Sequence, residues 1–159
     1  MFTLRSPAFA HDSPIPKRYT ADGEALSPPL SWTEVPEGTR SFALVVDDPD
    51  APDPANPKRT YVHWVVYNLP ASCTELPADA ARHLPQGAKH GRNDAGTTGY
   101  VPPDPPIGEH RYFFKLYALD CLLDLEQPTK QRLMKAMDGH ILGKAEMFGR
   151  YSKVTAEVG

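Results

Sequence analysis

Residues 108–117 read Gly108-Glu109-His110-Arg111-Tyr112-Phe113-Phe114-Lys115-Leu116-Tyr117. Aromatic and aliphatic residues dominate this stretch, which predicts a β-strand over His110–Leu119. Because side chains alternate between the two faces of a strand, His110 and Tyr112 point to the same face. An imidazole and a phenol are therefore expected side by side at the start of this strand.

Two further stretches place polar groups next to apolar strands. They read Val45-Val46-Asp47-Asp48-Pro49-Asp50-Ala51-Pro52 and Tyr61-Val62-His63-Trp64-Val65-Val66-Tyr67. Asp48 and Asp50 lie where an apolar strand gives way to a loop interrupted by prolines. If the three strands are neighbours, two carboxylates, two imidazoles and a phenol converge at one mouth, an arrangement typical of a small-ligand site.

These groups also have structural explanations. Asp before Pro is favourable turn chemistry, because Pro fixes φ and the Asp side chain can accept from a backbone amide two residues on. That explanation accounts for one carboxylate and not for Asp47, Asp48 and Asp50 together. His63 is flanked by aromatic and β-branched residues, where a lone histidine is more often a satisfied core residue than a ligand-binding one.

The stretches resemble the two signature regions of the phosphatidylethanolamine-binding protein family, whose animal members include Raf kinase inhibitor protein. Further pieces are similar to the bacterial and archaeal branch of that family. They are Ser6-Pro7-Ala8-Phe9, Ile15-Pro16, Tyr19, Asp22-Gly23, Ser27-Pro28-Pro29-Leu30-Ser31-Trp32, Arg92-Asn93-Asp94, Gly99-Tyr100, Pro105-Pro106, Gly139-His140-Ile141-Leu142 and Gly149-Arg150-Tyr151. The resemblance runs from about Phe2 to Lys153, and the order and spacing of the pieces make it specific.

Apolar runs separated by prolines predict a mainly β protein. We expect a single domain over residues 1–159, since this length is near the usual size of one domain. Strands are expected over Phe2–Leu4, Leu30–Trp32, Ser41–Asp47, Tyr61–Leu69, His110–Leu119 and Ala145–Lys153. The resemblance implies the fold of the phosphatidylethanolamine-binding proteins, with a central antiparallel-dominated β-sheet flanked by a smaller sheet and few short helices.

Local patterns add detail to this fold. Tyr61–Leu69 is largely apolar on both faces, which predicts a strand central to the sheet and covered on both sides. A helix is expected over Pro128–Asp138, because proline stands near its first turn and glycine follows its end. A short helical turn is expected at Asp79–Leu84. The loops Asp50–Arg59 and Gly87–Gly108 are long, which favours a functional role for them.

Composition excludes several classes of protein. The net charge is −3 and no Lys/Arg-rich run is present, which argues against a nucleic-acid partner. No apolar stretch is long enough for a transmembrane segment, and the N-terminal residues lack the apolar region of a signal peptide, so a cytoplasmic location is expected. Cys73 and Cys121 show no Cys-x-x-Cys or metal-ligand spacing, and we expect idle thiols in a reducing compartment; a redox pair or a nucleophile is the alternative.

The convergent groups allow two kinds of ligand. Two histidines and two aspartates could hold a metal ion, but no local His-x-His or His-x-x-x-His spacing preorganises such a site, so neither metal nor cofactor is expected. A small anion such as a phosphoryl head group fits better, because imidazolium, tyrosine hydroxyl and backbone amides donate to its oxygens. The aspartates would orient the histidines and would repel a dianion, which favours a monoanion or a zwitterion.

The resemblance implies a small anion-binding pocket at this place. Its residues, carried over by position, are Asp48, Asp50, His63, Pro106, His110, Tyr112 and Tyr151. It also implies a protein that binds a phospholipid head group or another small phosphorylated ligand, and in some members an inhibitor of a kinase or protease. Ala25, Ala95 and Pro102-Pro103 depart from the family pattern, which puts the outer shape of the pocket in question.

A binding protein rather than an enzyme is expected. The chain has no Gly-x-Ser-x-Gly, no His-Glu-x-x-His and no phosphate-loop pattern. The alternative is a hydrolase, similar to an esterase or phosphatase, that uses the Asp/His pocket for acid–base chemistry. The partners expected are thus a small phosphorylated ligand, a kinase or protease of unspecified identity, and a second copy of the chain in a homodimer through the apolar, proline-rich segment 101–107.

Overall fold

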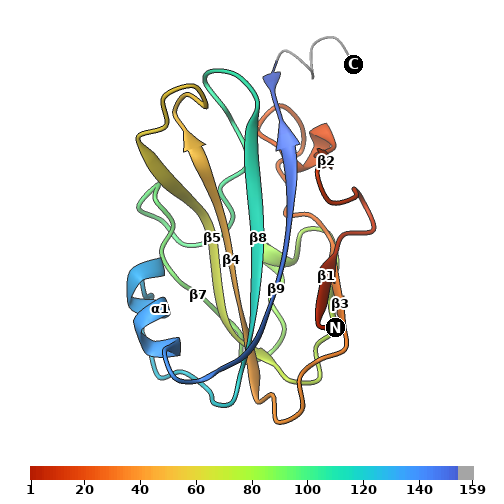
Figure 1. Cartoon of the computed structure of the whole chain (residues 1–159), viewed down its shortest axis with the longest axis vertical. Helices are drawn as coiled ribbons and strands as arrows, with labels where there is room; N and C mark the ends of the chain where they lie inside the picture. The colour runs from red at the N-terminus through yellow and green to blue at the C-terminus, as the bar shows by residue number, and fades with distance from the viewer. Residues whose placement is uncertain (154–159) are drawn as a thin grey trace.

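The computed structural model describes residues 1–153. The β-strands form a six-stranded sheet in the order β2-β9-β8-β4-β5-β7 and a three-stranded sheet in the order β1-β3-β6 (Figure 1). The elements in chain order are β1 (Thr3–Arg5), β2 (Ser13–Pro14), the 3-10 helix η1 (Lys17–Tyr19), β3 (Leu30–Thr33), β4 (Ser41–Ala51), β5 (Arg59–Pro70), β6 (Glu75–Leu76), the 3-10 helix η2 (Ala80–Arg82), β7 (Lys89–His90), β8 (His110–Leu119), α1 (Lys130–Met137) and β9 (Ile141–Tyr151). The expected mainly β fold, with two sheets and few short helices, is confirmed.

The large sheet separates two apolar layers. Every residue of β4 except Pro49 is buried, because the strand has side chains in both layers. On one face Phe42 packs edge-on against Trp32 of the small sheet, with ring centroids 5.4 Å apart. On the other face Leu133 and Met137 of α1 are completely buried against β4, β5 and β8. Figure 1 shows α1 on one side of the large sheet and β1 and β3 on the other.

The strand expected over Tyr61–Leu69 is covered on both sides, but its predicted central position in the sheet is wrong. β5 pairs along its length with β4, and on its other edge only with the two residues of β7. A loop takes the place of a further strand there, since the amide of Asp94 donates to the carbonyl of Val62 and that of Val101 to the carbonyl of His63, both at 2.9 Å. The long loop 87–108 is therefore fixed against the strand that carries His63.

The helix predicted over Pro128–Asp138 is present as α1. Its first turn is capped by Thr129, whose hydroxyl accepts from the amide of Arg132 at 3.2 Å. The helical turn expected at Asp79–Leu84 is the shorter η2. No helix within residues 1–153 is long and apolar enough to cross a membrane.

Candidate functional site

The three aspartates at the end of β4 separate onto different faces of the sheet. Asp47 is fully buried on the face that carries α1, where its carboxylate lies 3.0 Å from Nζ of Lys115 and 2.6 Å from Nζ of Lys130. Because strand side chains alternate, Asp48 points to the opposite face. Asp47 thus ties helix α1 to the sheet and takes no part in the candidate site.

Asp48 forms a hydrogen bond with His110, as expected if the strands that carry them are neighbours. The Nδ1 atom of His110 lies 2.6 Å from Oδ2 of Asp48, and its Nε2 lies 3.0 Å from the carbonyl of Pro52 and 2.9 Å from that of Ile107. All three partner atoms accept hydrogen bonds, so both ring nitrogens satisfy them only when both carry hydrogen. The second Asp48 oxygen accepts from the amide of Asp50 at 2.7 Å.

This geometry changes the role expected of His110. Both of its nitrogens are occupied by protein acceptors, so in this structure the ring offers no free donor to a ligand. It instead joins β8 to the loops at Pro52 and Ile107. His110 is a positioning residue that shapes the wall of the site.

Asp50 lies outside the cavity wall. Its two oxygens accept from the backbone amide and the guanidinium of Arg111, at 2.9–3.0 Å. Burial raises the pKa of this carboxyl, but the hydrogen bonds and charge of Arg111 outweigh burial, and the net pKa is lowered. Asp50 is therefore an ionised anchor for the start of β8.

A cavity of about 570 Å³ opens beside the Asp48–His110 pair. Its wall consists of Asp48, Ala51, Pro52, Lys58, Arg59, Tyr61, His63, Val101, Pro102, Asp104, Pro105, Pro106, His110 and Tyr112. Four rings stand in a row along one side, with centroids 4.9 Å apart for Tyr61 and His63, 5.2 Å for His63 and Tyr112, and 6.3 Å for Tyr112 and His110. The cavity has the size and mostly apolar wall of a small-molecule site.

His63 has one nitrogen available to a ligand. Its Nδ1–H donates to the carbonyl of Val101 at 2.7 Å, which fixes the tautomer, and Nε2 makes no hydrogen bond to any residue of the described chain. Burial lowers the pKa of His63, and neither the Val101 carbonyl nor the nearby carboxylates reverse the shift. At neutral pH the ring is uncharged, so Nε2 accepts a hydrogen bond, and it becomes a donor only when the ring is protonated.

Tyr112 supplies a neutral donor next to His63. Burial, followed by the negative charge of Asp48, raises the pKa of its phenol well above the usual range. Within residues 1–153 its hydroxyl makes no hydrogen bond, and although the residue is only 1% exposed, this oxygen is not among the fully buried polar atoms that lack a partner. The hydroxyl therefore faces the cavity that Tyr112 lines, where it can donate to a ligand oxygen.

Two basic residues at the cavity mouth were not predicted from the sequence. Lys58 is exposed, and its ammonium group forms no ion pair within the described chain. Arg59 lies 3.1 Å from Asp94 and places its guanidinium 5.1 Å from the ring of Tyr61. The only sequence signal for them was the length of the loop 50–59, because neither residue belongs to the strand ends on which the prediction rested.

Of the two remaining residues predicted for the site, Pro106 and Tyr151, only Pro106 lines the cavity. Tyr151 pairs with His110 across β8 and β9, and its hydroxyl donates to Asp22 at 2.6 Å. Its role in the described structure is to fasten β9 to the loop that follows η1.

Both cysteines are free thiols. Burial raises the pKa of the Cys73 thiol, and burial together with the charge of Asp120 raises that of Cys121. A catalytic nucleophile needs the opposite shift, because the thiolate is the reactive form. The alternative of an activated cysteine nucleophile therefore has no support.

Nearly the whole chain is similar to known proteins. The family model described as phosphatidylethanolamine-binding protein matches residues 5–152. A UPF0098 protein of Methanothermobacter thermautotrophicus is 48% identical over 153 residues, covering 94% of this chain and 98% of the relative. A UPF0098 protein of Chlamydia trachomatis is 45% identical over 151 residues, with the same coverage of 94% and 98%.

Solved structures agree with these matches. The crystal structure of CT736, a phosphatidylethanolamine-binding protein homologue from Chlamydia trachomatis, superposes with a TM-score of 0.87 at 43% identity, covering 95% of this chain and 97% of the other. Escherichia coli YbcL gives a TM-score of 0.85 at 34% identity, with 95% and 98% covered. A carboxypeptidase Y inhibitor solved with its cognate proteinase gives 0.57 at 18% identity, covering 94% and 81%, which shows a shared fold alone.

Proposed function

The chain belongs to the phosphatidylethanolamine-binding protein family, and from that premise we propose that its cavity binds one phosphoryl group of a small ligand. Membership fits a binding or inhibitor-like role in general. The ligand class follows from the groups on the cavity wall. A phosphate diester with an ethanolamine arm fits best, since it has a single negative charge on phosphorus and a cation at the other end.

The observation that carries the proposal is the set of polar groups without a full complement of protein partners around one cavity. Tyr112 offers a hydroxyl donor, and Lys58 offers an ammonium group at the mouth. Phosphate oxygens accept such charge-assisted hydrogen bonds, each contributing ~1.5–3 kcal/mol. The neutral Nε2 of His63 can accept from a ligand ammonium or a phosphate hydroxyl, and it becomes a third donor when protonated.

The ring wall suits the organic part of such a ligand. Tyr61 and Pro106 form apolar sides of the same cavity. Asp104, also in the wall, forms an ion pair with Lys153 and provides a carboxylate that can attract the ammonium group of the ligand. A zwitterion can therefore place its phosphate near Lys58 and its ammonium group near a carboxylate, whereas Asp48 and Asp104 would repel a dianion.

Binding without turnover is favoured over hydrolysis by the state of the carboxylates. Asp48 and Asp50 were the candidates for acid–base chemistry, but both accept hydrogen bonds from protein donors on each oxygen. A general base needs a lone pair that can reach water or substrate. Asp50 does not line the cavity, and Asp48 is held on one oxygen by His110 and on the other by the amide of Asp50, so neither carboxylate is a free general base positioned toward a ligand.

Titration calorimetry with glycerophosphoethanolamine tests the proposal. Tyr112→Phe and Lys58→Ala should each weaken binding by roughly tenfold, which corresponds to the lower end of the free energy of a hydrogen bond to a charged group. The lower end applies to Lys58 because its ammonium group is exposed and solvent screens its charge. Lys135→Ala is the matched control, since Lys135 is an exposed lysine on α1 and does not line the cavity.

Two outcomes would contradict the proposal. One is an absence of saturable binding of glycerophosphoethanolamine and of inorganic phosphate to the unmodified protein. The other is an equal affinity of the unmodified protein, Lys58→Ala and Tyr112→Phe. Release of nitrophenol from p-nitrophenyl acetate or phosphate, lost in His63→Ala and kept in His83→Ala, would instead support the hydrolase.

A further inference from the structure

A second cluster of chemically active side chains lies at the other end of β8. The strand begins at His110, beside the cavity, and ends at Leu119, so its ten residues span on the order of 30 Å. Asp120 and Cys121 follow this end directly, and His140 immediately precedes β9. Leu119 pairs with Ile141 between the two strands, which brings segments 20 residues apart to the same place.

The backbone around the cluster is held in position. The amide of Asp120 donates to the carbonyl of His140 at 3.0 Å, and the amide of His140 donates to the carbonyl of Met137 at 2.9 Å. The carbonyl of Cys121 accepts from the hydroxyl of Ser41 at 2.6 Å. These hydrogen bonds fix the main chain at Asp120, Cys121 and His140, so the three side chains start from fixed backbone positions.

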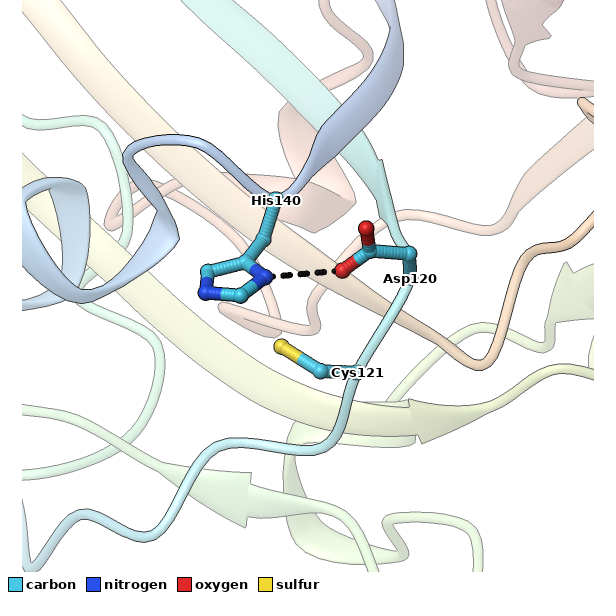
Figure 2. A group of neighbouring side chains, drawn as sticks. All are labelled: Asp120, Cys121 and His140. Atoms are coloured by element: carbon cyan, nitrogen blue, oxygen red, sulfur yellow. Dashed lines mark hydrogen bonds and ion pairs between the residues drawn. The ribbon is translucent and has the colours of Figure 1, made fainter.

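The side chains converge on one point. Nδ1 of His140 lies 2.8 Å from Oδ1 of Asp120, and the thiol of Cys121 faces both (Figure 2). One donor atom from each residue lies within 4.8 Å of the other two. Asp120 and His140 have side chains 45% and 47% exposed, so an ion could enter from solvent.

We propose that Asp120, Cys121 and His140 bind a Zn²⁺ ion. Thiolate, imidazole and carboxylate are the three side-chain ligand types that zinc takes in proteins, and three protein ligands with an open fourth position for water form a complete tetrahedral set. The carboxylate and the thiolate together neutralise the charge of the ion. Ions that prefer only oxygen ligands, such as Mg²⁺ and Ca²⁺, are disfavoured by the sulfur and the imidazole.

Little movement is needed to close the site. The three donor atoms now lie within 4.8 Å of one another. Zinc–ligand distances are about 2.0–2.3 Å, so the donor atoms around a tetrahedral ion must lie somewhat closer together than this. Rotation of the partly exposed side chains is sufficient, because their backbones are already adjacent. The ion takes the place of the hydrogen between Nδ1 of His140 and Asp120, leaving the imidazole neutral with its hydrogen on Nε2, and any excess ring proton and the thiol proton are released to solvent on binding.

Cobalt substitution tests the proposal on the untagged protein with a non-thiol reductant. Co²⁺ bound to a thiolate gives a sulfur-to-metal charge-transfer absorption, which should appear on titration and disappear when Zn²⁺ is added. Cys121→Ser should abolish this absorption and His140→Ala should weaken Zn²⁺ binding at least tenfold. Cys73→Ser and His83→Ala are the matched controls, and both should bind as the unmodified protein does.

The proposal is overturned if no thiolate absorption appears, if it persists in Cys121→Ser, or if it follows Cys73 instead. Circular dichroism of each variant shows whether it is folded, and loss of binding in a folded Cys121→Ser supports the site. Zinc binding that His63→Ala removes and His140→Ala leaves unchanged would place the ion in the cavity and also overturn it.

Discussion

Replacing Asp48 with asparagine should destabilise the folded protein by about 2 kcal/mol. The Asp48 and His110 side chains are 4% and 1% exposed, and their contact is 2.6 Å long. A hydrogen bond to a charged group contributes ~1.5–3 kcal/mol, whereas removing one whole partner of a buried ion pair costs ~3–5 kcal/mol. Asparagine retains an oxygen that can accept from His110 or from the amide of Asp50, so the lower range applies.

Urea unfolding followed by circular dichroism measures this loss directly. For a chain of 159 residues, about 2 kcal/mol corresponds to a fall in Tm of ~4–8 °C. Asp124→Asn is the control, because Asp124 is exposed and forms no hydrogen bond or ion pair through its side chain within the described chain. It should change stability by less than ~0.5 kcal/mol.

A double-mutant cycle separates the contact from other effects of the substitution. Asp48→Asn and His110→Gln should be non-additive by about 1–2 kcal/mol, because each removes the same interaction. A loss of less than ~0.5 kcal/mol in Asp48→Asn, or full additivity in the double variant, would refute the argument that this pair joins the two strands.

Three further predictions follow from the same geometry. Tyr151→Phe should leave the affinity for glycerophosphoethanolamine unchanged in calorimetry while lowering Tm, because the hydroxyl bonds Asp22 outside the cavity; a tenfold loss of affinity would return Tyr151 to the site. Gly149→Ala should cost ~1–3 kcal/mol in urea unfolding, because its Cβ would lie 2.5 Å from Ile15 Cγ1; unchanged stability would contradict this. Affinity for glycerophosphoethanolamine should be constant above about pH 7 and rise as the pH falls below ~6.5, since burial holds the pKa of His63 below its usual value and the protonated ring becomes a donor; a pH dependence that survives in His63→Gln would exclude this cause.

Long apolar strands made most of the fold predictable. Residues 110–119 have both periodicity and composition in favour of a strand, and β8 has those bounds. The two-residue strands β2, β6 and β7 were missed because they are too short to carry a pattern. The position of β5 was misjudged for another reason: an apolar edge can be covered by a loop as well as by a strand, and the sequence does not distinguish the two.

The candidate site was predictable where it depends on strand alternation. His110 and Tyr112 both line the cavity, and Asp48 meets His110, as neighbouring strand ends require. Lys58 was missed because a loop positions it, and Arg59 was missed because β5 begins two residues before the strand expected from Tyr61. Similarly, no local spacing links Asp120 and Cys121 to His140, since the pairing of β8 with β9 alone brings them together.

The crystal structure of the protein grown with glycerophosphoethanolamine tests the central claim most directly. We predict the phosphorus atom within the cavity, with phosphate oxygens at hydrogen-bond distance from the Tyr112 hydroxyl and Nζ of Lys58, and with the His110–Asp48 contact intact. Phosphate density elsewhere on the molecule, or an unoccupied cavity at saturating ligand, would contradict the account.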